Sequence, residues 1–72
     1  MLNLQVDGAK LRTLREASGL SVKALAEKVG CSNWHIYRIE SGHGQPGAET
    51  YGAIKKALKA DDTDLLAKGD AA

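Results

Sequence analysis

Residues 21–42 contain two short helical segments separated by a glycine, and this spacing constrains the fold more than any other feature of the chain. Ser21 and Ser32 are residue types that cap helix N-termini, and Gly30 suits the left-handed position at a helix end. At about 100° per residue, the first segment gathers its apolar side chains on one stripe. That stripe consists of Val22, Leu25, Ala26 and Val29. The pattern predicts two short helices joined by a tight turn.

Similar signals predict three further helices. Asp7 is a good N-cap for a helix that ends near Ser18 and Gly19. Asp61 can cap a short last helix. The chain has 72 residues, and its hydrophobic residues, 43% of the total, include no Phe. Together these features favour an all-α fold, a compact five-helix bundle in one domain. We expect an N-terminal arm or short strand over 1–6, the domain over 7–66 with its helix-turn-helix segment at 21–41, a loop over 42–47, a helix over 48–59, and a flexible tail over 67–72.

Composition excludes several classes of protein. Cys31 is the only cysteine, so no internal disulfide is expected, and it has no metal-ligand companions. No apolar run reaches 18 residues, and the first ten residues lack the pattern of a signal peptide. No phosphate-binding loop or HExxH motif is present. These observations predict a cytoplasmic, non-membrane protein that is not an enzyme and has no cofactor or metal.

The segment after Ser32 has two chemically different sides. On a helical wheel Ile36 and Ile39 fall together, and we expect them to face the core. The opposite side combines amide, indole, phenol and guanidinium groups in one patch. An outward Trp beside Tyr and Arg is typical of an interface. The four residues of this patch are Asn33, Trp34, Tyr37 and Arg38.

These residue types fit the major groove of double-stranded DNA. Arg can bond guanine, Asn can bond adenine, and Trp can pack on a thymine methyl group. The two helix N-termini present amide N–H groups that can receive phosphates, and we expect Lys23 and Ser32 to contact phosphates there. The net charge of +1 supports a nucleic-acid role only weakly.

Four stretches of the chain resemble the Cro/C1-type helix-turn-helix family, which includes phage repressors and many bacterial regulators and antitoxins. The resemblance implies a lambda-repressor-like fold and a transcriptional regulator, such as a repressor, that binds DNA as a homodimer. It places Asn33, Trp34 and Arg38 at base-reading positions, with Tyr37 adjacent. Arg15 and Glu40 match a structural ion pair. The stretches are LRTLREASGLS (11–21), KALAEKVGCS (23–32), IYRIESG (36–42) and ETYGAIKKAL (49–58); the positions implied to approach phosphates are Arg12, Ser21, His43 and Gln45.

Two positions depart from the family pattern. The family usually has Gln at the second position of the motif's first helix, where this chain has Val22. The loop after Gly42 is usually basic, whereas His43-Gly44-Gln45 contains no Lys or Arg. Both departures predict fewer DNA contacts and a shallower salt dependence of binding.

A second hypothesis therefore stands beside DNA binding. The same fold could act as a protein-interaction adaptor or antitoxin-like module with a protein partner. Trp34 could then cover an apolar patch or a dimer interface, and Arg38 could be a solvated charge. His35 is expected to pack rather than to catalyse, and Cys31 to be a buried thiol.

Overall fold

The computed structural model describes residues 5–67, and over this range the chain forms five helices. Capping side chains explain where the first three begin. Asp7 accepts hydrogen bonds from the N–H groups of Ala9 and Lys10, Ser21 from that of Ala24, and Ser32 from that of His35. Gly30 ends the second helix at φ +87°, a conformation that costs glycine little. The helices are α1 (Gly8–Ala17), α2 (Val22–Val29), α3 (Asn33–Glu40), α4 (Ala48–Leu58) and α5 (Asp62–Leu65).

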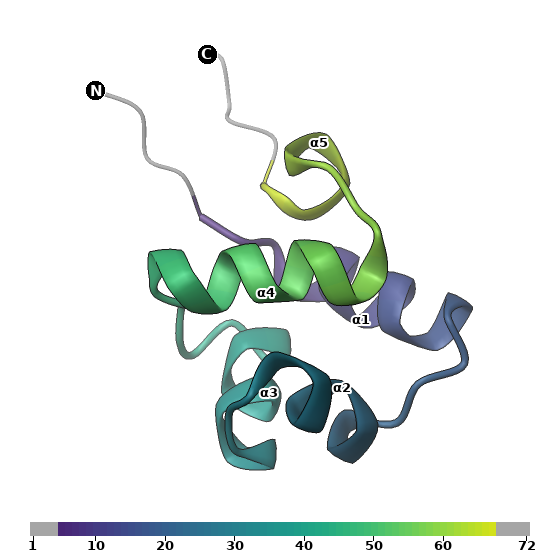
Figure 1. The fold of residues 1–72 in the computed structure, drawn as a ribbon. Helices are drawn as coiled ribbons and strands as arrows, with labels where there is room; N and C mark the ends of the chain where they lie inside the picture. The colour runs from purple at the N-terminus through teal and green to yellow at the C-terminus, as the bar shows by residue number, and fades with distance from the viewer. Residues whose placement is uncertain (1–4, 68–72) are drawn as a thin grey trace, which may run out of the picture.

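The helices surround one aliphatic core. Helix α2 packs against α3 and α4, and α1 packs against α3 and α5 (Figure 1). Figure 1 shows α4 crossing the middle of the molecule, with α2 and α3 together on one side of it and α5 on the other. Each helix contributes at least one fully buried side chain, so none is dispensable to the core. These side chains are Leu11, Leu25, Ile36, Ile39, Ile54 and Leu65.

The two ends of the described chain pair with each other. Val6 forms an antiparallel bridge with Leu66, the Asp7 N–H donates to the Leu65 carbonyl (2.8 Å), and the Ala67 N–H donates to that of Gln5 (2.8 Å). We call residues 5–7 and 65–67 the terminal pair. Of the arm or short strand expected over 1–6, Val6 forms this single bridge; residues 1–4, and the tail expected over 67–72 except Ala67, lie outside the described range.

Lys10 secures the terminal pair from α1. Its Nζ donates to the carbonyl oxygens of Leu66 (2.9 Å) and Thr63 (3.3 Å). These carbonyls lie at the C-terminal end of α5, where carbonyl oxygens have no N–H partner within the helix. Lys10 therefore closes the contact between α1 and the end of the described chain. Between residues 5 and 67, no helix is long and apolar enough to cross a membrane.

Candidate nucleic-acid interface

Helix α3 faces the core with its isoleucine side and solvent with its opposite side, as the sequence predicts. Ile36 and Ile39 are completely buried. On the opposite side Trp34 is 68% exposed and Tyr37 is 55% exposed. Asn33 and Arg38 are exposed as well. The side chains expected to form a contact patch therefore share one open surface, supported from behind by the isoleucines.

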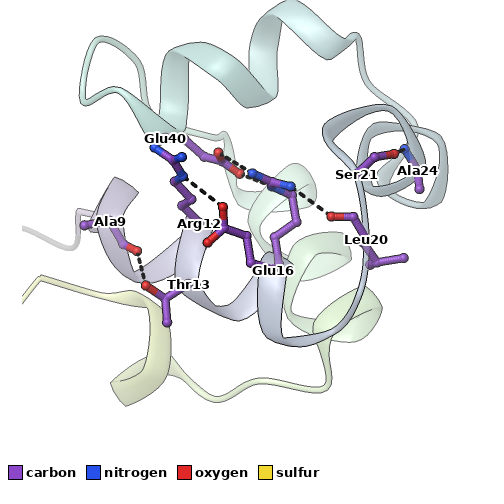
Figure 2. Close-up of polar contacts among 9 residues, drawn as sticks. Ala9, Arg12, Thr13, Glu16, Leu20, Ser21, Ala24 and Glu40 are labelled. Atoms are coloured by element: carbon purple, nitrogen blue, oxygen red, sulfur yellow. Dashed lines mark hydrogen bonds and ion pairs between the residues drawn. The ribbon is translucent and has the colours of Figure 1, made fainter.

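An ion pair fixes the far end of α3 to α1. The Arg15 Nε donates to Glu40 Oε2 (2.6 Å) and its Nη2 donates to Glu40 Oε1 (3.2 Å). Its Nη1 donates to the Leu20 carbonyl (2.8 Å). Dashed lines at the labelled Glu40 and Leu20 mark these contacts in Figure 2. The two side chains are only 11% and 8% exposed. The hydrogen bond to Glu40 raises the pKa of Arg15, while desolvation acts in the opposite direction. The two residues thus form the ion pair that the resemblance implies, and its contribution to stability stays a prediction.

The start of α1 also lies directly against the end of α3. A Cβ atom at position 8 would overlap the carbonyl oxygens of Ile39 and Glu40. Gly8 is therefore required by close backbone contact and not by a turn. Together with the ion pair, this contact sets how α3 projects from the bundle.

The N-termini of α2 and α3 carry groups suited to an anion. Ser21 Oγ accepts from the Ala24 N–H (3.0 Å; Figure 2), and Ser32 Oγ accepts from the His35 N–H (3.1 Å). A hydroxyl that accepts in this way still has its own proton to donate. The first two amide N–H groups of each helix also lack intrahelical acceptors. Lys23 is exposed in the first turn of α2.

Arg38 folds back onto the loop that follows α3. Its Nη2 donates to the His43 carbonyl (2.8 Å). The Ser41 Oγ and the His43 Nδ1 lie 3.0 Å apart. Around this point the surface forms a hollow of about 380 Å³ between α3 and the loop. The hollow is lined by Trp34, Tyr37, Arg38, Ser41 and His43.

Two residues expected at phosphates are engaged within the chain. Arg12 Nε lies 3.2 Å from Glu16 Oε2, although both side chains are more than half exposed (Figure 2). Gln45 is held more completely, because its Oε1 accepts from the Val6 N–H (2.7 Å) and its Nε2 donates to the Val6 carbonyl (3.2 Å). The Gln45 amide is thus used for an internal contact, although its Nε2 keeps a second N–H, and the expected phosphate contact of Gln45 stays a prediction.

The remaining sequence expectations concern single side chains. Val22 is buried against the core, which explains why this position offers no polar group. His35 is partly buried, in keeping with packing. Cys31 was expected to be a buried thiol, but it is only half-buried. Desolvation raises the pKa of its thiol. Among residues 5–67, no three His, Cys, Asp or Glu side chains gather to hold a metal ion.

Sequence reasoning missed Gly44 as a part of this surface. A Cβ there would come within 3.4 Å of Arg38 Cβ and 3.5 Å of its Nε, which is ordinary van der Waals contact, so this part of the loop lies beside the arginine. The available signal was a glycine in the loop, six positions after an exposed arginine. That signal is weak, since glycines in loops serve many purposes.

The fold and this surface define the class. Residues 8–67 match the family described as "Helix-turn-helix domain", and the chain belongs to that family. Its architecture is the compact, five-helix, lambda-repressor-like form of the domain, which confirms the fold expected from the sequence.

Individual proteins similar to this chain include members of the same class. The chain is 36% identical over 52 residues to an uncharacterized HTH-type transcriptional regulator of Mycobacterium tuberculosis, found in two strains. The match covers 72% of this chain and 37% of the regulator. The chain therefore spans well under half the length of these curated relatives.

Solved structures resemble the chain over most of its length. The P22 c2 repressor in complex with a synthetic operator has a TM-score of 0.79 at 35% identity, covering 88% of this chain and 94% of the repressor. The clp gene regulator ClgR of Corynebacterium glutamicum has a TM-score of 0.73 at 30% identity, covering 79% and 61% of the two chains. The restriction-modification controller protein C.AhdI of Aeromonas hydrophila has a TM-score of 0.73 at 28% identity, covering 79% and 86%.

Proposed function

We propose that this chain binds double-stranded DNA with sequence specificity and acts as a transcriptional regulator of the repressor type. The observation that carries the proposal is the open side of α3, where Trp34 is 68% exposed beside Tyr37 and Arg38. The major groove of B-DNA accepts one α-helix, and α3 has the length and exposure to enter it. The P22 c2 repressor structure, which has the same fold, contains a synthetic operator.

Within the groove, different side chains would read different groups. Arg38 would donate to the O6 and N7 of a guanine, and Asn33 would pair with an adenine. The rings of Trp34 and Tyr37 line one wall of the hollow beside Arg38 and would pack against thymine methyl groups. This arrangement favours a site in which a guanine is next to thymine-containing base pairs.

Phosphate contacts would come from the ends of the helices. The cap hydroxyls of Ser21 and Ser32, with the first amides of α2 and α3, suit two phosphates that flank the groove. Lys23 and Arg12 would add charge, and the His43 ring lies at the loop side of the hollow. Gln45 is engaged with Val6, which leaves only the second N–H of its Nε2 for the phosphate contact expected of it.

The assembled form we propose is a homodimer acting in the cytoplasm. One α3 reads only a few base pairs, so two copies on one face of the duplex extend the site. Helix-turn-helix dimers place their half-sites about 34 Å apart, one helical turn of DNA. The site should accordingly be a palindrome or near-palindrome with that spacing.

Selection from a pool of random double-stranded DNA tests the proposal. We expect a palindromic motif to be enriched, and binding to the selected site to fall at least about tenfold in Arg38→Ala. The control is Lys56→Ala, because Lys56 is an exposed cation on α4, outside the proposed surface. If no sequence is enriched, or if the two variants bind equally well, the proposed function is wrong.

A second candidate function is a protein-interaction adaptor or antitoxin-like module. Two exposed aromatic side chains on a chain of net charge +1 favour it. Purification from native cells distinguishes the two functions. A stoichiometric protein partner that is lost in Trp34→Ala, with no enrichment of any DNA site, would favour the adaptor.

A further inference from the structure

The loop between α3 and α4, residues 42–47, is fastened at two neighbouring points to different parts of the molecule. On one side Arg38 bonds the His43 carbonyl. On the other side Gln45 bonds the main chain of Val6, 39 positions earlier in the sequence. Only Gly44 lies between these two points. A displacement at one attachment must therefore be felt at the other.

The attachment at Val6 is rigid. The Gln45 amide uses its Oε1 and its Nε2 on the N–H and carbonyl of the same residue, in the way that one strand pairs with another. Val6 itself is 6% exposed and bridges Leu66 in the terminal pair. The residues on either side of Val6 are bonded to the chain end as well, through Gln5 and Asp7. Gln45 is thus bonded to residues 5–7, a segment that is itself hydrogen-bonded to residues 65–67.

The attachment at Arg38 acts on the proposed base-reading side chain. A Cβ at position 44 would be in van der Waals contact with the Arg38 side chain, so the loop lies close to it, and the His43 carbonyl accepts from one terminal nitrogen of Arg38. An unrestrained arginine loses rotamer freedom when it binds, and that loss weakens binding. An arginine already held by the loop loses less.

We propose that Gln45 is a positioning residue for DNA recognition: it holds the loop against Val6 so that the His43 carbonyl keeps the Arg38 guanidinium oriented for a base. The inference rests on the proposed function of α3. It gives Gln45 a role different from the phosphate contact expected from the resemblance. Its effect on DNA passes through Arg38, whereas a phosphate contact would act independently.

The test uses Gln45→Met, which keeps the side-chain length but removes both hydrogen bonds. Gln5→Met is the matched control, because it is the same replacement on an exposed side chain of the terminal pair. The first measurement is NMR relaxation of the Arg38 Nε–H group without DNA. We expect Gln45→Met to increase the mobility of this group, and Gln5→Met to leave it unchanged.

The second measurement is a double-mutant cycle of affinity for the selected DNA site, with Gln45→Met, Arg38→Met and the double variant. We expect Gln45→Met to weaken binding about tenfold in the wild-type background and less than about threefold in the Arg38→Met background. A structural role alone would lower thermal stability without this dependence on Arg38.

The outcomes separate the proposals. If Gln45→Met weakens binding equally in both backgrounds, Gln45 acts independently of Arg38, as a phosphate contact would, and the positioning role is wrong. Unchanged Arg38 mobility overturns it as well. If the wild-type chain binds no DNA site, the proposed function fails, and the positioning role for DNA fails with it.

Discussion

At the scale of single residues, exposure separates side chains that stabilise the fold from those available for binding. Ile36 and Trp34 are two positions apart on α3, yet one is completely buried and the other is 68% exposed. Removing a buried side chain leaves a cavity, whereas removing an exposed one leaves none. Removing the Ile36 side chain should therefore mainly lower stability, whereas removing the Trp34 side chain should mainly weaken binding.

Trp34→Ala is expected to weaken DNA binding by about 2 kcal/mol, the usual size of an aromatic hot spot, with almost no change in melting temperature. The control, Ile36→Ala, should lose about 2–5 kcal/mol of unfolding free energy, because it opens a cavity in the core. Fluorescence anisotropy with the selected DNA and calorimetry measure the two effects. A large drop in the melting temperature of Trp34→Ala would show that the indole supports the core.

The Arg15–Glu40 pair supports a prediction about stability. Glu40→Ala leaves the guanidinium without its partner in a site where the side chains are 11% and 8% exposed. Breaking a buried pair on one side typically costs about 3–5 kcal/mol, and we expect a loss near the lower end because some exposure remains. The double variant Arg15→Leu/Glu40→Leu should lose less, since no charge is left unpaired. An unchanged unfolding curve for Glu40→Ala would contradict the role of the pair.

At the scale of elements, α5 is too short to be stable alone and depends on its contacts. Tyr51 Oη donates to Asp62 Oδ1 (2.6 Å) and Lys55 Nζ lies 2.9 Å from the same oxygen. The ammonium also lies 4.9 Å from the centre of the Tyr51 ring. Desolvation and the hydrogen bond to Asp62 raise the pKa of Tyr51 to about 12. These three side chains connect α4 to the first turn of α5.

This connection should weaken in acid. The hydrogen bonds from Tyr51 and Lys55 lower the pKa of Asp62 below its ordinary value of 3.8. Folding therefore favours the ionised carboxylate, so its contribution is complete above pH 3.8 and is lost as the pH falls through the lower, folded-state pKa. The difference in melting temperature between wild type and Asp62→Asn should consequently shrink as the pH falls below this value. A difference that stays constant to about pH 2 would contradict this.

Helix boundaries were predictable from the sequence because capping is local. Asp7, Ser21 and Ser32 each accept a hydrogen bond from an amide N–H two or three residues ahead, so both partners lie within one short stretch of sequence. The outward side of α3 was predictable for a related reason, since helical periodicity alone separates Ile36 from Trp34. The contact of Gln45 with Val6 was not, because nothing local brings together residues that are 39 positions apart. The turn of Arg38 toward His43 depends on the loop conformation, which periodicity does not describe.

At the scale of the whole molecule, the number of cations on the proposed surface determines how binding responds to salt. Only Arg12, Lys23 and Arg38 bring positive charge to it, and Arg12 is shared with Glu16. Val22 and the loop over 42–47 add none. Most of the affinity must then come from base contacts and neutral donors, which release few counterions.

A plot of log affinity against log salt concentration should consequently be shallow, with a slope of about −2 per protomer and about −4 for a dimer, because only Arg12 and Lys23 of each protomer are expected at phosphates. Lys23→Gln should reduce the steepness by about 1 per protomer, because one phosphate contact is removed. Lys56→Gln, on α4, should leave the slope unchanged. Anisotropy titrations of the selected site at four or more salt concentrations provide the measurement. A slope steeper than about −8 would mean that many more phosphates are neutralised than this surface accounts for, so that other lysines, on α4 or elsewhere, contact the DNA.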